Sequence, residues 1–141
     1  MVQKKNRLTL ENNLMLNGRK ETSEKIILNS FKIIQKVSAK ETKPIIKTAL
    51  KNISPILSLT KVKSRKSLKY VPFFLLKYKR ITNSIRILAS NSKNNKRHIV
   101  NSLQNLLLDS AYDKGIIKDK IKELHVNSFI NKNFSYYRWF Q

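Results

Sequence analysis

The acidic and histidine side chains are the groups that could support catalysis, and they are few. Asp109 and Asp113 lie four positions apart on a predicted helix, so they share one face. Paired carboxylates act as general acid and base when a cleft shifts their pKa values. A solvated helix face near basic residues is the simpler interpretation of this pair. The carboxylates alone therefore do not indicate an enzyme.

The two histidines, His98 and His125, are far apart and have no acidic neighbours at metal-ligand spacing. His125 is interpreted as a packed or RNA-contacting residue. The chain has no cysteine, which excludes disulfides, thiolate zinc sites and cysteine nucleophiles. Gly18 and Gly115 are isolated, so no glycine-rich phosphate loop is present. We predict a protein without enzymatic activity, metal or cofactor.

Charge is the strongest feature of the sequence. The 141 residues include 30 Lys and Arg but 8 Asp and Glu, a net charge of +22. Solubility requires a net charge of only about 2–8. The basic residues gather near the ends of predicted elements, at 4–7, 19–20, 61–69, 77–80 and 93–97. This distribution favours binding to the phosphates of a nucleic acid.

Helical periodicity dominates the elements that would position these cations. Apolar residues recur at helical spacing over 22–37, 44–53, 81–89, 99–111 and 121–129. Pro44 suits the first turn of the second helix and Pro55 ends it. The fold class is therefore mainly α, with about five to six helices in one domain over 1–141. No apolar run is long enough to span a membrane.

Two segments depart from the helical pattern. Leu57 and Leu59 alternate with polar residues, and apolar character returns before Pro72, which predicts a β-hairpin over 57–71. A two-stranded ribbon is marginal alone, so we expect it to project and meet a partner. Residues 1–16 are basic without strong periodicity and are interpreted as an N-terminal arm that orders on a polyanion.

The C-terminal aromatic residues allow two interpretations. Phe134, Tyr137 and Trp139 can anchor the tail to the core. Alternatively, Tyr136, Arg138 or Trp139 can stack on splayed RNA bases.

Several motifs resemble one family, that of ribosomal small-subunit protein seven, the bacterial-type head protein. The most specific is the ending H-x₅-N-K-x-F-x-x-Y-R-W, which begins at His125 and ends at Trp139. The family's usual Gly-Gly at the hairpin tip is replaced by Arg65-Lys66, so the chain departs from the pattern there. Further matches are Leu14–Lys20, Ser23–Ile27, Phe31, Ala49–Asn52, Pro55 and Val71-Pro72.

The resemblance implies a helical body with an extended hairpin that binds the 3′ major domain of small-subunit rRNA and nucleates head assembly. The hairpin would lie near the exit-site tRNA and the mRNA exit path, beside neighbouring head and platform proteins. By position, the expected rRNA contacts are Lys4, Lys5, Arg7, Arg19, Lys20, Lys25, Lys61, Lys63, Arg65, Lys66, Lys69, Lys79, Arg80, Arg97, Lys132 and Arg138.

The same comparison suggests where the protein works. Lys, Ile and Asn, whose codons are A/T-rich, are abundant, and no presequence is evident. With the divergence from the family pattern, these features resemble mitochondrion-encoded versions, so we expect the mitochondrial matrix. A nucleoid-type basic DNA-binding protein is the alternative, and it would require minor-groove wedges or paired arms. We expect neither a membrane partner nor a homo-oligomer.

Overall fold

The computed structural model describes residues 2–38, 41–64, 67–94 and 98–140. Arg65, Lys66 and Arg97, three of the expected RNA contacts, lie outside these ranges. The chain is mainly α with one two-stranded antiparallel ribbon, which confirms the predicted fold class. The elements are α1 (Val2–Leu14), α2 (Lys20–Ser38), α3 (Thr42–Ile53), β1 (Leu57–Ser64), β2 (Ser67–Phe74), α4 (Lys77–Lys93), α5 (Ile99–Ala111), α6 (Ile116–Ile130) and a 3₁₀ segment, η2 (Lys132–Phe140).

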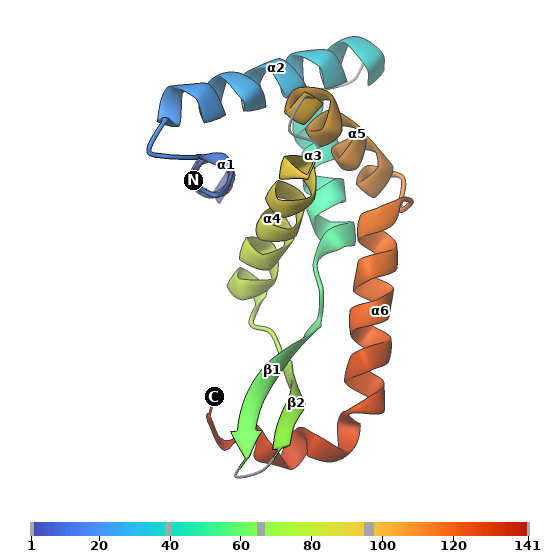
Figure 1. Ribbon diagram of the computed structural model, residues 1–141. Helices are drawn as coiled ribbons and strands as arrows, with labels where there is room; N and C mark the ends of the chain where they lie inside the picture. The colour runs from blue at the N-terminus through green and yellow to red at the C-terminus, as the bar shows by residue number, and fades with distance from the viewer. Residues whose placement is uncertain (1, 39–40, 65–66, 95–97, 141) are drawn as a thin grey trace.

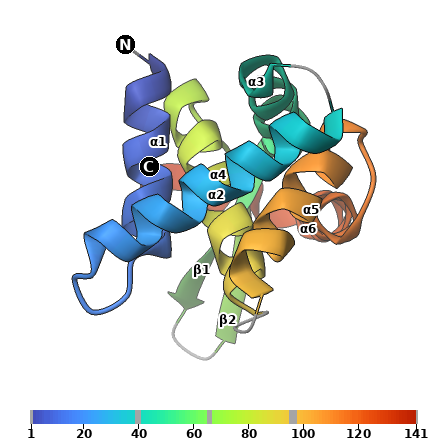
Figure 2. The same cartoon turned by 90° about the horizontal axis from the view of Figure 1, so that it is seen from above.

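The helices form a body from which the ribbon projects. In Figure 1, α2 lies across the top of the body and the ribbon leaves it at the bottom, beside α6. After α6 the chain turns and η2 passes close to the end of the ribbon (Figure 1). Seen from above, α1 and α3 stand at the edge of the body, on either side of α4 (Figure 2). Within the described ranges, no helix is long and apolar enough to cross a bilayer.

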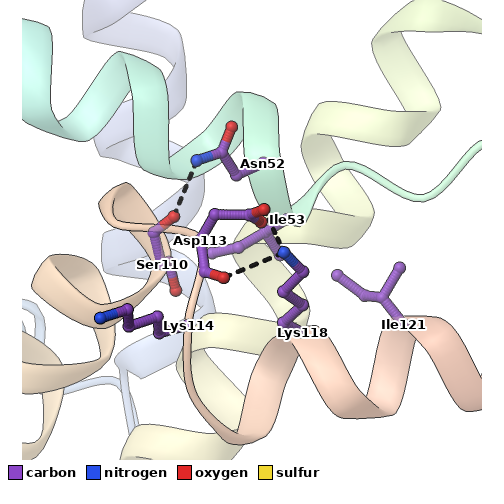
Figure 3. Close-up of a pocket in the computed structure, with 7 residues that line it drawn as sticks. All are labelled: Asn52, Ile53, Ser110, Asp113, Lys114, Lys118 and Ile121. Carbon is purple, nitrogen blue, oxygen red and sulfur yellow. Dashed lines mark hydrogen bonds and ion pairs between the residues drawn. The ribbon is translucent and has the colours of Figure 1, made fainter.

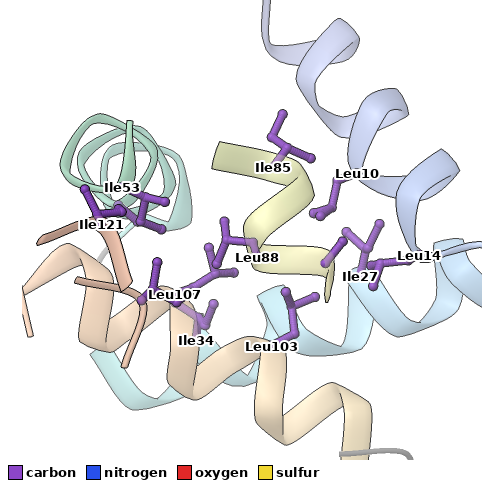
Figure 4. Packing of buried hydrophobic residues seen from close by; sticks show 13 residues of the cluster. Leu10, Leu14, Ile27, Ile34, Ile53, Ile85, Leu88, Leu103, Leu107 and Ile121 are labelled. Carbon is purple, nitrogen blue, oxygen red and sulfur yellow. The ribbon is translucent and has the colours of Figure 1, made fainter. Parts of the chain in front are cut away.

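The core of the body is aliphatic. Each of the six α-helices contributes Leu, Ile or Ala side chains to one buried cluster, shown in Figure 4. Ile27, Ile34 and Leu103 are fully enclosed. The stripes read from the sequence therefore face one another, as the periodicity predicts. The cluster comprises Leu10, Leu14, Ile27, Ile34, Ala49, Ile53, Ile85, Leu88, Ala89, Leu103, Leu107, Ile117 and Ile121.

Serine is the small residue that allows these helices to approach closely. Each buried serine donates its hydroxyl proton to a carbonyl three or four residues earlier in its own helix, so burial leaves no donor unpaired. The Ser30 hydroxyl of α2 also lies 3.2 Å from the carbonyl oxygen of Val100 in the first turn of α5. The six are Ser23, Ser30, Ser84, Ser92, Ser110 and Ser128.

The N-terminal segment is a helix, so the expectation of an arm over 1–16 is wrong for the residues described. Leu10 and Leu14 lie one turn apart on α1 and are buried against the body. Glu11 between them is also buried and accepts a hydrogen bond from Arg7. The apolar face of α1 is short and surrounded by polar residues, which made its periodicity weak in the sequence.

The ribbon is longer than predicted. Its register runs from Leu57 opposite Phe74 to Ser64 opposite Ser67, so the strands extend three residues beyond the predicted end at Val71. Pro72 is tolerated inside β2 because a two-stranded ribbon leaves one edge of each strand without a partner.

One face of the projecting ribbon is covered by other parts of the chain. Side chains opposite each other in the register share a face. Val71 is fully buried on the face that carries Thr60 and Lys69. Helix α6 lies against β1, and η2 lies against β2, where Tyr137 accepts a hydrogen bond from Lys69. We call this face the inner face; the outer face has the buried Pro72 near its base and the exposed Lys61, Lys63 and Tyr70 toward its tip.

Candidate nucleic-acid interface

The basic residues expected to contact RNA fall into two groups at opposite ends of the molecule (Figure 1). The body group lies on α1 and α2, and the ribbon group on β1, β2 and η2. Lys79 and Arg80 lie between them, in the first turn of α4. Lys4 and Lys5 lie in α1, whose first four side chains are outside the description. The body group is Arg7, Arg19, Lys20 and Lys25; the ribbon group is Lys61, Lys63, Lys69, Lys132 and Arg138.

Arg7 is engaged inside the protein. Its Nε lies 2.8 Å from a carboxylate oxygen of Glu11, and its Nη2 lies 2.7 Å from one of Glu24. The Glu11 pair lies within α1 and the Glu24 pair joins α1 to α2, so the guanidinium has a structural role in addition to the RNA contact predicted from its position.

The turn between α1 and α2 presents free cations. Asn17 and Gly18 adopt φ values of 51° and 73°, a left-handed conformation that these residues tolerate well. The turn leaves Arg19, Lys20 and Lys25 exposed. Within the described ranges none of these three forms an ion pair. Their charges are therefore available to a polyanion.

The outer face of the ribbon combines cations with aromatic and apolar groups. The register places Lys61 opposite Tyr70 and Lys63 opposite Leu68. The Lys61 ammonium lies 5.8 Å from the centroid of the Tyr70 ring, which is 40% exposed. A ring can stack on an unpaired base while lysines contact the phosphates on either side. This face thus has the chemistry for single-stranded RNA.

The inner face holds Lys69, which is occupied within the protein. Its Nζ donates a hydrogen bond of 2.8 Å to the Tyr137 hydroxyl. The same nitrogen lies 4.5 Å from the Tyr137 ring centroid and 5.4 Å from that of Phe134. Lys69 therefore attaches β2 to η2. This role differs from the rRNA contact expected from its position in the sequence.

The Lys69 contact shifts the ionisation of both partners. The hydrogen bond from Lys69 lowers the pKa of the Tyr137 hydroxyl, and the same bond raises the pKa of Lys69. The pKa of Tyr136 is raised by hydrogen bonding to Tyr137, whose ring centroid lies 4.3 Å away. Lys69 therefore keeps its proton to higher pH, and the Tyr137 hydroxyl loses its proton at lower pH, than each group would without the contact.

The C-terminal aromatics divide between the two interpretations. Phe134 and Tyr137 are half-buried and pack on the ribbon through Lys69, so they anchor the tail there and outside the aliphatic core. Tyr136 is 68% exposed. Arg138 donates from Nε to the Ser135 carbonyl. The side chain of Trp139 lies outside the description.

Two further basic residues contact groups that are close to them along the chain. Arg80 donates from Nε to the Leu75 carbonyl at 2.9 Å, which fixes the chain where β2 leads into α4. The Lys132 ammonium lies 4.8 Å from the ring centroid of Phe129. Lys79 and Lys63 are exposed and form no ion pair within the described ranges.

The groups considered for catalysis have structural surroundings. Asp113 forms an ion pair with Lys118 at the turn between α5 and α6 (Figure 3). Asn52 of α3 donates to the carbonyl oxygens of Ser110 and Ala111 beside it. The adjoining depression offers about 10 Å³, room for about one water molecule. No group of acidic and histidine residues within the described ranges could hold a metal ion.

His125 is packed, one of the two roles considered for it. Its side chain is half-buried, and its Nε2 is enclosed without a hydrogen-bond partner among the described residues. His98 is exposed at the start of α5.

The sequence interpretation missed one set of exposed lysines. Lys43, Lys47 and Lys51 lie on α3 at i, i+4 and i+8. Clusters of adjacent basic residues drew attention to the ends of elements, whereas this set is separated by apolar residues. Its helical spacing was the available signal.

Comparison with known proteins gives a consistent result. A family model described as ribosomal protein S7p/S5e matches residues 2–131. The chain is 30% identical over 129 residues to small ribosomal subunit protein uS7 of Helicobacter hepaticus, covering 91% of this chain and 83% of that protein. It is 29% identical over 131 residues to the protein of the same name from Exiguobacterium sibiricum, covering 92% and 84%. The corresponding Desulfitobacterium hafniense protein is 30% identical over 129 residues, covering 91% and 83%.

Proposed function

Because the chain belongs to the ribosomal protein S7p/S5e family and is thus a structural component of the small ribosomal subunit, we propose that it binds the 3′ major domain of the small-subunit rRNA and nucleates assembly of the subunit head. The observation that carries this proposal is the family match over residues 2–131, which includes the helical body and the ribbon. The excess of 30 basic over 8 acidic residues supplies the electrostatic attraction to rRNA.

The helical body is the main rRNA-binding part in this proposal. Arg19, Lys20 and Lys25 are exposed on a rigid turn and helix, so binding them costs little ordering of the backbone. Lys79 adds a cation where the ribbon joins α4. Lys4, Lys5, Arg65, Lys66 and Arg97 remain proposed contacts on sequence grounds.

The ribbon serves the exit-site tRNA and the emerging mRNA. The support is its outer face, where Lys61 and Lys63 accompany the exposed ring of Tyr70. Single-stranded RNA is bound by such combinations of stacking and charge. Because Lys69 on the inner face is bound to Tyr137, we take the outer face to be the one directed toward these RNAs.

Neighbouring head and platform proteins are the proposed protein partners. Val126, Phe129 and Ile130 lie on one side of α6 and are 58%, 69% and 67% exposed. An apolar group of this kind on a basic protein suits contact with another protein. Homo-oligomerisation is not expected, since the high positive charge of each copy would oppose it.

The mitochondrial ribosome is the proposed location. The abundance of residues with A/T-rich codons supports an organellar gene. Sedimentation of the tagged protein with small subunits of purified mitochondrial ribosomes is the expected result. Its recovery from another compartment's ribosomes would contradict the location while leaving the ribosomal role intact.

The function is tested by identifying the RNA that co-purifies with the tagged full chain and by mapping its footprint. We expect small-subunit rRNA, protected in the 3′ major domain, with affinity that falls steeply with salt. An isolated 5′ domain of the same rRNA is the control. Equal binding to both domains, or preferential recovery of DNA, would overturn the proposal, and the latter would support a nucleoid protein.

A further inference from the structure

Helix α3 presents three lysines in a row that winds gradually around one side of the helix. Lys43, Lys47 and Lys51 are each one turn apart, about 6 Å along the helix axis. All three are exposed. The opposite side of the helix carries Ala49 and Ile53, which are buried in the core. We call Lys43, Lys47 and Lys51 the α3 lysine row.

The helix that carries this row is held firmly in the body. It packs along α5, with α4 and α6 as further neighbours. Asn52 donates a hydrogen bond of 3.0 Å to the carbonyl oxygen of Ser110 (Figure 3) and another of 3.2 Å to that of Ala111. The three Cα positions are therefore fixed relative to one another, and only the side-chain stems need ordering on binding.

The row is not neutralised by the described part of the chain, although Glu41 precedes it at the N-cap of α3. Within the described ranges none of its lysines forms an ion pair, and α3 contains no acidic residue. On α6 the situation differs, because Lys118 pairs with Asp113 and Lys122 lies 3.9 Å from Asp119. The chain has few acidic residues and they are unevenly distributed. Helix α3 therefore presents a concentrated positive face.

We infer that the α3 lysine row is a further RNA-binding surface, which holds consecutive phosphates of an rRNA strand apart from the body group and the ribbon. This inference rests on the proposed function, since it takes rRNA as the polyanion. RNA is favoured over an acidic protein segment because the row offers only ammonium groups at regular spacing. Such groups bind phosphates as point charges without side-chain specificity.

The test compares two triple variants of the full chain on the small-subunit 3′ domain rRNA. The first is Lys43→Gln, Lys47→Gln and Lys51→Gln; glutamine keeps helix propensity and polarity. The matched control is Arg86→Gln, Lys120→Gln and Lys122→Gln, which removes the same charge at exposed positions of α4 and α6 that are not assigned to RNA. Equal melting temperatures for wild type and both variants would establish that folding is unchanged.

We expect the slope of log affinity against log salt to fall in magnitude by about 2–3 for the α3 variant and by less than about 1 for the control. The α3 variant should also lose one stretch of rRNA protection from hydroxyl radicals. Equal slopes for the two variants, with wild-type protection retained, would overturn the inference while the proposed function stands. Failure of the wild-type chain to bind this rRNA would overturn the proposed function itself.

Discussion

The helical body and the ribbon end are stabilised by different kinds of contact. The body encloses mainly aliphatic side chains and hydrogen-bonded serines, together with Glu11, which is paired with Arg7. The ribbon is attached to η2 by aromatic rings around one lysine, Lys69. Aliphatic packing is lost as a whole when the helices separate, whereas the aromatic contacts at the ribbon can open locally. The comparison suggests a rigid RNA-binding body and a ribbon whose orientation is adjustable.

The largest effect should come from the core of the body. Leu103→Ala removes a fully buried side chain that packs between helices. We expect a loss of about 2–5 kcal/mol in the free energy of unfolding, measured by urea denaturation. Leu76→Ala is the control, since Leu76 is 61% exposed and its truncation should change stability by less than about 0.5 kcal/mol. Similar losses for the two variants would contradict the described core.

The next prediction separates the two parts by their RNA. Arg19→Gln with Lys20→Gln should reduce the salt slope of 3′ domain rRNA binding by about 2, because two phosphate contacts are lost. Lys61→Gln with Lys63→Gln should leave that slope nearly unchanged and reduce crosslinking of exit-site tRNA in assembled subunits. If the ribbon variant loses rRNA affinity as strongly as the body variant, the proposed division between them is wrong.

A smaller and local effect is expected at Lys69. Lys69→Met keeps the apolar stem but removes the ammonium that contacts Tyr137. Amide hydrogen exchange in β2 should become faster, while exchange in α5 stays as in the wild type. Tyr78→Phe is the control, since Tyr78 is 64% exposed on α4. Unchanged exchange in β2 would show that Lys69 does not hold the ribbon.

The same contact predicts a pH dependence. The pKa of Tyr137 is lowered by Lys69, so the contact strengthens as pH rises through that pKa and the phenolate forms beside the ammonium. The pKa of Lys69 is raised, so this stabilisation is lost when pH rises further and the ammonium deprotonates. In an ultraviolet titration, the first tyrosine to ionise should shift to higher pH in Lys69→Met. An identical titration curve would contradict the assignment.

The smallest effect should follow Glu24→Gln. The Arg7–Glu24 ion pair is about half exposed, and such pairs contribute about 0–1 kcal/mol. Arg7 retains its pair with the buried Glu11. Chemical denaturation should therefore detect a change below about 1 kcal/mol that shrinks at high salt. A loss comparable to that of Leu103→Ala would mean that α1 depends on this pair for its attachment.

Much of the fold could be predicted because helices are encoded locally. The stripes over 22–37 and 44–53 correspond to α2 and α3, and Pro55 lies beyond the end of α3 at Ile53. The hairpin was found from alternation, although its strands continue to Phe74. Helix α1 was missed because Leu10 and Leu14 form too short an apolar face to stand out among polar neighbours.

The candidate RNA interface was predictable in kind but not in detail. The charge of +22 required a polyanion, and the motif from His125 to Trp139 pointed to a ribosomal family. The sequence did not show which of the basic side chains face solvent. Arg7 is neutralised by Glu24, 17 positions away, and such a pairing depends on how α1 packs against α2.

The sequence by itself determined the helical pattern, the aliphatic stripes, the net charge and the family motifs, because each depends on residue types at short spacing or on composition. Only the tertiary structure decided that Lys69 lies on the covered face of the ribbon while Lys61 lies on the open one. Tyr137, which accepts the hydrogen bond from Lys69, is 68 positions away along the chain. Alternation shows that a strand has two faces, but the contact that covers one of them forms only when α6 brings η2 back to the ribbon.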